Sequence, residues 1–175
     1  FALIVDRAIA HVRVRLDYAS FVRRLQQLTD GRKFAEAVQF CKQYRSPVAR
    51  TTEAYLRYVN DNESLRSAAV QREGSESLEL VEKRQRGLSA VANIATLTGL
   101  LGTVVGLVEA FHQIELAQGM VQPSDLASGI WQALLTTVFG LTIAIPSLAA
   151  FHVFESRTDR IARRMEFIVL QLDQW

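Results

Sequence analysis

The feature that most limits how this chain can fold is a long stretch without positive charge. No lysine or arginine occurs from Gly87 to Ser156, although the 175-residue chain contains 20 of them. A helix in water needs charged residues on its solvated face, and a membrane span excludes lysine and arginine most strongly. The stretch is therefore predicted to lie in a lipid bilayer, and we look for the function there.

Two apolar segments inside this stretch are long enough to cross a bilayer, which takes about 20 residues. Residues 88–111 contain one ionisable side chain, Glu109, and residues 126–154 contain no aspartate, glutamate, lysine or arginine. Basic residues precede the first segment and follow the second, so the positive-inside rule places residues 6–87 and 155–175 in the cytoplasm. The connection, residues 112–125, is then expected to be periplasmic.

The part before the first span is predicted to be a cytoplasmic helical domain, residues 6–87. Phe21, Leu25 and Leu28 recur at helical spacing, and no proline interrupts the chain between Pro47 and Pro123. An apolar stripe also continues at helical spacing through residues 155–175. We therefore expect an all-α membrane protein whose long transmembrane helices extend into the cytoplasmic domain. Residues 1–5 are expected to be the end of a first transmembrane helix that is largely missing from this chain.

Small residues repeat along one face of each span and predict close helix packing. Such faces let two backbones approach each other inside a membrane. The residues concerned are Gly99, Gly102 and Gly106 in the first span and Gly129, Ala133 and Gly140 in the second. Pro146 removes a backbone donor within the second span, so we expect a kink there.

Polar side chains beside these faces are the candidates for an ion pathway and a partner contact: Thr103, Gln132, Thr136 and Thr137. Each threonine could instead bond only to a carbonyl of its own helix. Hydroxyl and amide groups do not titrate in the useful pH range, and no carboxylate lies near the middle of either span. If ions cross here, another chain is expected to supply the titratable group.

Composition argues against several other functions. The net charge of +2 gives no reason to expect nucleic-acid binding. Cys41 is the only cysteine, and the three histidines have no second ligand at metal-binding spacing, so we predict no metal site and no cofactor. No nucleophile, base and orienting carboxylate form a recognisable motif, so we predict no catalytic residues and no enzyme activity.

The two spans carry motifs that resemble those of a known family. The segments GLLGTVVGL, residues 99–107, and GIWQALLTTVFGL, residues 129–141, are similar to the last two spans of the MotA/TolQ/ExbB proton-channel family. Within that family the sequence is most similar to the ExbB branch. The resemblance implies that Thr103 and Thr137 face a central pore. Several family members have a glutamate where this chain has Gln132, so we expect Gln132 to be a polar contact and no proton relay.

The resemblance also implies an assembly in the bacterial inner membrane. A homopentamer would surround an ExbD-like single-span partner that carries the protonatable aspartate, and proton flow would act through a TonB-like protein on outer-membrane transport. Two alternatives remain open at this point. One is a TolQ-like subunit that maintains the cell envelope, and the other is a membrane scaffold that conducts no ions. Either protons or sodium ions could be conducted.

Overall fold

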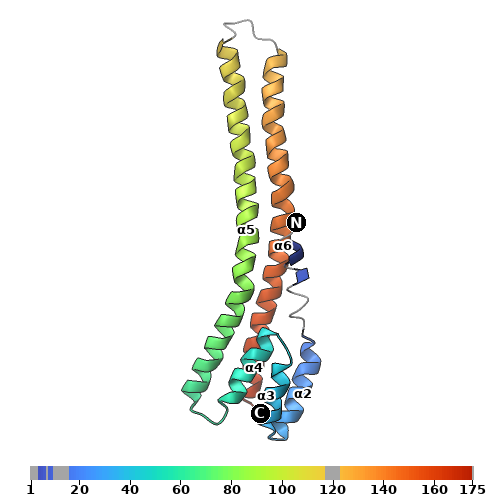
Figure 1. Ribbon diagram of the computed structural model, residues 1–175, viewed down its shortest axis with the longest axis vertical. Coiled ribbons are helices and arrows are strands. Elements are labelled where there is room, and N and C mark those ends of the chain that lie inside the picture. The colour runs from blue at the N-terminus through green and yellow to red at the C-terminus, as the bar shows by residue number, and fades with distance from the viewer. Residues whose placement is uncertain (1–3, 7, 10–15, 117–122, 175) are drawn as a thin grey trace. The chain divides into compact units, whose positions relative to one another are not determined.

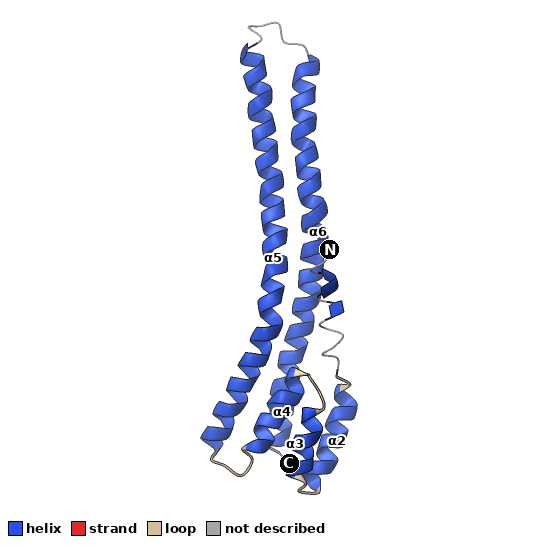
Figure 2. Ribbon diagram, viewed as in Figure 1, coloured by secondary structure: helices blue, strands red, loops and turns tan. Residues whose placement is uncertain are grey.

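The computed structural model describes residues 4–6, 8–9, 16–116 and 123–174. Its elements are α2 (Tyr18–Asp30), α3 (Phe34–Lys42), α4 (Pro47–Arg57), α5 (Glu63–Leu116) and α6 (Pro123–Leu172) (Figure 1). The described residues contain no β-strand (Figure 2), which confirms the predicted all-α class. Both α5 and α6 include a segment that is long and apolar enough to cross a membrane.

The described residues form two compact units. Unit 1 comprises residues up to Gln85 together with those from Val153, and unit 2 comprises Arg86–His152. The expected spans, residues 88–111 and 126–154, lie within α5 and α6. The expected loop, residues 112–125, is helical at both ends because α5 continues to Leu116 and α6 begins at Pro123. Its central residues 117–122 lie outside the described part of the chain, as do residues 1–3, which belong to the expected end of a largely missing transmembrane helix.

Short polar side chains set the first turns of two helices in unit 1. The carboxylate of Asp17 accepts hydrogen bonds from the backbone N–H of Ser20, at 3.5 Å, and from its hydroxyl, at 2.7 Å. These bonds lower the pKa of Asp17. At the start of α5, Oδ1 of Asn62 accepts from the N–H of Ser64 at 3.2 Å. Both contacts satisfy N–H groups that lack a partner within their helix.

The core of unit 1 joins α2, α3 and α4 to the C-terminal part of α6. Phe21 is 1% exposed, and its ring stacks on Phe40 at 5.4 Å and meets the edge of Tyr44 at 5.5 Å. Ile168 and Met165 of α6 belong to the same buried cluster. The sequence predicted residues 6–87 and 155–175 as separate cytoplasmic segments, and the structure adds that they share one hydrophobic core.

A buried polar contact also ties α5 to α6 within unit 1. Nε2 of Gln85 donates to the hydroxyl of Thr158 at 2.6 Å and to the carbonyl of Phe154 at 3.3 Å. The Thr158 hydroxyl in turn donates to the Phe154 carbonyl at 3.1 Å. Gln85 and Thr158 are both buried, so these bonds satisfy polar groups that water does not reach.

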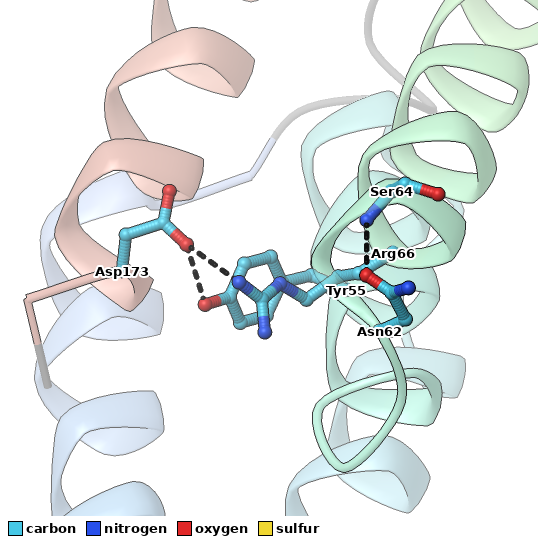
Figure 3. A network of polar contacts seen from close by, with 5 residues as sticks. All are labelled: Tyr55, Asn62, Ser64, Arg66 and Asp173. Carbon is cyan, nitrogen blue, oxygen red and sulfur yellow. Dashed lines mark hydrogen bonds and ion pairs between the residues drawn. The ribbon is translucent and has the colours of Figure 1, made fainter.

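A second polar network holds the end of α6 against α4 and α5 (Figure 3). The Tyr55 hydroxyl donates to Oδ1 of Asp173 at 2.7 Å, and the Arg66 guanidinium lies 3.6 Å from the same oxygen. Arg66 also lies over the Tyr55 ring, 5.0 Å from its centre. Burial and the hydrogen bond to Asp173 raise the pKa of Tyr55 to about 12. The network therefore joins residues that are 118 positions apart.

We expect Tyr55→Phe to lower the free energy of unfolding of unit 1 by about 1 kcal/mol, because one partly buried hydrogen bond is lost. The wild type should also lose stability between pH 10 and 12. There the unfolded tyrosine ionises while the buried one, with its raised pKa, stays neutral. Tyr55→Phe should lack this part of the loss. Denaturant unfolding of the full chain in detergent, followed by circular dichroism at pH 7 and from pH 10 to 12, measures both effects, and Tyr58→Phe, at an exposed tyrosine, is the control.

Candidate functional site

In unit 2 the backbones of α5 and α6 approach each other along their small residues. A Cβ added to Gly106 would lie 2.7 Å from Cβ of Ala133, and one added to Gly129 would lie 2.6 Å from Cβ of Ala110. Gly102 faces Thr136 in the same way, with 2.6 Å between the added Cβ and Cβ of Thr136. Real Cβ atoms are not found so close together, so these positions have no room for a larger residue.

At Gly99 and Gly140 the two helices face each other with backbone atoms. A Cβ on Gly140 would lie 2.7 Å from the carbonyl oxygen of Ala95 and 2.9 Å from Cα of Gly99. Because these neighbours are backbone atoms, no side-chain rotation could relieve the overlap. All six small residues predicted to serve helix packing thus lie where α5 and α6 meet in unit 2.

The polar residues singled out in the sequence make different kinds of bond. The Thr137 hydroxyl donates across the helix pair to the carbonyl of Gly99 at 3.0 Å. The hydroxyls of Thr103 and Thr136 stay within their own helices and donate to Leu100 and Ala133, at 2.6 and 2.7 Å. The alternative that a threonine serves its own helix therefore describes Thr103 and Thr136, whereas Thr137 links the two helices.

An open groove of about 850 Å³, which we call the α5–α6 groove, lies along one side of this contact. Its lining includes Gly99, Gly102, Gly106 and Gly140 together with the large apolar residues Ile94, Leu101, Val105, Phe139 and Ile143. The polar residues Gln132 and Thr136 line it as well, whereas Thr103 and Thr137 are not among its lining residues.

The helical repeat explains this separation. Thr103 follows Gly102, and Thr137 follows Thr136, so each lies about 100° around its helix from a groove residue. On α5, Gly106 and Gly99 contact the other helix. Around the helix axis they lie between the direction of Gly102, which faces the groove, and the direction of Thr103. Thr103 and Thr137 therefore lie on the opposite flank of the helix pair from the groove, which we call the threonine flank. The four polar residues are divided between two sides of the pair.

Glu109 was not predicted as a site residue, but it lines one end of the groove. A signal was available, because Gly102, Gly106 and Glu109 follow one another at steps of four and three, the spacing of one helix face. Nε2 of Gln113 donates to Oε1 of Glu109 at 3.3 Å. Beside Gln113 on the same helix, Nδ1 of His112 lies 3.8 Å from a carboxylate oxygen of Glu115.

The described part of the chain offers hydroxyl, amide and carboxylate groups but no metal centre, since it has no group of three histidine, cysteine or acidic residues that could hold an ion. Cys41 is buried in unit 1, and burial raises the pKa of its thiol to about 12, so it is a poor nucleophile. Pro146 lies inside α6, which is helical on both sides of it. The kink predicted there stays a prediction.

The outward surface of unit 2 is apolar. Ile94, Leu97, Leu101 and Val108 are each about 60% exposed on α5, and Trp131 is 70% exposed on α6. Exposing so much apolar surface to water is unfavourable, and soluble monomers rarely show large continuous apolar patches. Lipid or other membrane helices are the surroundings that suit this surface.

Known proteins are similar to this chain over part of its length. Residues 43–167, more than half of the chain, match the model of a family described as the MotA/TolQ/ExbB proton channel family. The chain is 36% identical over 90 residues to the biopolymer transport protein exbB1 of Vibrio cholerae, which covers 51% of this chain and 40% of that protein.

Two further relatives extend the comparison. The putative biopolymer transport protein ExbB homolog of Methanothermobacter thermautotrophicus is 27% identical over 133 residues, 76% of this chain and 47% of that protein. The Tol-Pal system protein TolQ of Haemophilus influenzae is 36% identical over 85 residues, 48% of this chain and 36% of that protein. The chain thus spans less than half the length of these three relatives. With the family model matched across both apolar helices, the chain is a membrane protein that belongs to the MotA/TolQ/ExbB proton channel family.

Proposed function

We propose that this chain is an ExbB-like subunit of a proton-driven motor in the bacterial inner membrane. The observation that carries the proposal is the threonine flank of unit 2. It presents Thr103 and Thr137, and the sequence of both spans has no carboxylate near their middle. Proton transfer through hydrocarbon needs a titratable group, so a partner has to supply it.

In this proposal five copies form a ring, with the threonine flank of each copy facing the ring interior. A single-span ExbD-like partner inside the ring carries the protonatable carboxylate. Proton movement drives the partner, and a TonB-like protein passes the energy to outer-membrane transport. Residues 6–87 and 155–175 lie in the cytoplasm and residues 112–125 in the periplasm. The distribution of basic residues supports this orientation.

The hydroxyl of Thr137 is the sharpest test of the proposal. Thr137→Val keeps the shape of the side chain but removes the hydroxyl, so we expect at least a tenfold loss of energised uptake in cells with the partner proteins, as expected for loss of a polar group in a transfer path. Thr137→Ser, which keeps the hydroxyl, should retain most activity. The measurement is siderophore-dependent growth of a deletion strain.

Two controls separate a pathway role from a structural one. Thr142→Val removes a hydroxyl that bonds the Val138 carbonyl of its own helix at 2.7 Å, and it should keep full activity. Size-exclusion chromatography of the purified complex should show that Thr137→Val still assembles with its partner. Full uptake by the valine variant would refute the assigned role. Absence of any proton-dependent activity with all partners present would favour the non-conducting scaffold.

A TolQ-like role is the second candidate, because a TolQ protein is among the relatives with 36% identity. Complementation distinguishes the two roles. Rescue of siderophore uptake in a strain lacking its own ExbB supports the first, and rescue of detergent resistance in a strain lacking TolQ supports the second. Flux into vesicles that contain a pH-sensitive dye, with and without sodium, identifies the conducted ion.

A further inference from the structure

The hydroxyl groups of the threonine flank donate their protons to backbone carbonyls. The Thr137 hydroxyl donates to the Gly99 carbonyl at 3.0 Å. The Thr103 hydroxyl donates to the Leu100 carbonyl at 2.6 Å. Thr96, seven residues before Thr103 and hence on the same side of α5, also donates to a carbonyl of its own helix, at 3.0 Å. A hydroxyl has one proton and two lone pairs, so while these bonds hold each oxygen can only accept a further hydrogen bond.

The packing of the two helices keeps the Thr137 hydroxyl beside the Gly99 carbonyl. A Cβ added to Gly99 would lie 3.3 Å from Cα of Thr137, so the α6 backbone lies against Gly99 at this level. In a membrane no water replaces a bond that the hydroxyl gives up, so turning the proton elsewhere has a cost. The Thr137 oxygen therefore offers lone pairs to a group that approaches the flank.

Other hydrogen-bond donors of the spans lie away from these threonines. Neither span contains a lysine or arginine. Their side-chain amides are Gln132, which lines the groove, and Asn93, which is ten residues before Thr103 and about 15 Å along α5. Trp131, six residues before Thr137, lies about 120° around α6 from it. The middle of the threonine flank is therefore a surface of acceptors.

Such a surface distinguishes the two forms of a carboxyl group. A carboxylate can only accept hydrogen bonds, so it meets no free donor there, and an unpaired charge in hydrocarbon is costly. The neutral acid has an O–H group that can donate to a lone pair. The flank therefore favours the neutral form.

We propose that the threonine flank recognises the partner's carboxyl group in its neutral, protonated form, with the acid O–H donating to the oxygen of Thr137. This inference rests on the proposed function, which places that carboxyl inside the ring. The carboxylate binds one proton from water to become the acid, and this proton then makes the hydrogen bond to Thr137. It returns to water when the acid leaves the flank and ionises.

The test compares binding of a carboxyl-bearing helix at two pH values. The full chain in sodium-free detergent micelles is mixed with a subsaturating synthetic single-span peptide of leucine and alanine that has one aspartate at its centre. A photoreactive benzophenone residue replaces Leu107, one turn from Thr103, and the crosslink yield reports binding. We expect Thr137→Val to lower the yield about twofold to tenfold at pH 5, as for one lost hydrogen bond, and to leave it unchanged at pH 9.

The other titratable groups of the spans lie away from Thr137. Residues 88–111 and 126–154 contain only Glu109 and His152. Glu109 lines the groove on the opposite flank, and His152 is 15 residues from Thr137, about 22 Å along α6. Adding Glu109→Gln to both proteins should therefore leave the comparison unchanged.

A second peptide and matched variants attribute the effect to the hydroxyl. A peptide with asparagine in place of aspartate can donate at any pH, so Thr137→Val should lower its yield at both pH values. Thr137→Ser, which keeps the hydroxyl, should bind both peptides as the wild type does. Thr142→Val removes a hydroxyl about 140° around α6 from Thr137 and should change neither yield.

The outcomes separate this inference from the proposed function. If Thr137→Val lowers the aspartate yield at pH 9 as much as at pH 5, or more, the hydroxyl serves a carboxylate as well. That result would overturn the inference and leave the proposed function in place. If Thr137→Val affects neither peptide at either pH, or if no crosslink forms from Leu107, both the inference and the proposed partner surface are wrong.

Discussion

Gly140→Ala is expected to push α5 and α6 apart in unit 2 and to lower its stability by about 1–3 kcal/mol, the usual cost of overpacking. The new methyl group would lie 2.7 Å from the Ala95 carbonyl oxygen and 2.9 Å from Cα of Gly99. Neither atom can rotate away, because both belong to the α5 backbone. The helices must separate, and the bond from Thr137 to the Gly99 carbonyl should lengthen with them.

Gly87→Ala is the matched control for this substitution. Gly87 is also a glycine of α5, but an added Cβ there has open space around it. Alanine should be neutral or should stabilise the helix by up to about 1 kcal/mol. Thermal unfolding in detergent micelles measures stability, and spin labels at the exposed residues Leu100 and Leu141 report the distance between the helices. An unchanged distance in Gly140→Ala would contradict the prediction, because it would mean that the space between α5 and α6 at Gly140 is large enough for a methyl group.

The helices were predictable because their signals are local. An apolar pattern at helical spacing needs only neighbouring residues, and the absence of proline after Pro47 allowed a long helix, which the structure places at Glu63–Leu116. The family could also be identified from the motifs around Gly102 and Gln132, because both are contiguous. Glycine spacing also indicated a small face on each span, and the structure places these residues where α5 and α6 meet.

Other features depend on contacts that no local pattern encodes. The hydrogen bond from Tyr55 to Asp173 joins residues 118 positions apart, and it forms only because α6 returns to the core of unit 1. The placement of Gln132 in the groove and of Thr137 on the threonine flank also depends on a contact between segments far apart in the sequence. Helical spacing gives the angle between Gln132 and Thr137, but the direction of the neighbouring helix decides that they lie on opposite flanks.

The second large effect is expected in unit 1, where Ile168→Ala should lower the free energy of unfolding by about 2–5 kcal/mol. Ile168 is 0% exposed and belongs to the core cluster that includes Phe21 and Leu25 of α2. Truncation removes apolar contacts and leaves a cavity that the helices fill only in part. We expect faster amide hydrogen exchange in α2, α3 and α4, since all three share this core with α6.

Phe167→Ala is the control at the preceding position, where the side chain is 54% exposed. It removes more hydrocarbon than Ile168→Ala but should cost clearly less stability, because more than half of the Phe167 side chain is already exposed and its truncation leaves no enclosed cavity. If exchange in α2 to α4 were unaffected by Ile168→Ala, the C-terminal part of α6 would not stabilise unit 1. If it rises as expected, residues 155–175 are a structural part of the helical domain, and truncating them should destabilise the three short helices even though each has its full sequence.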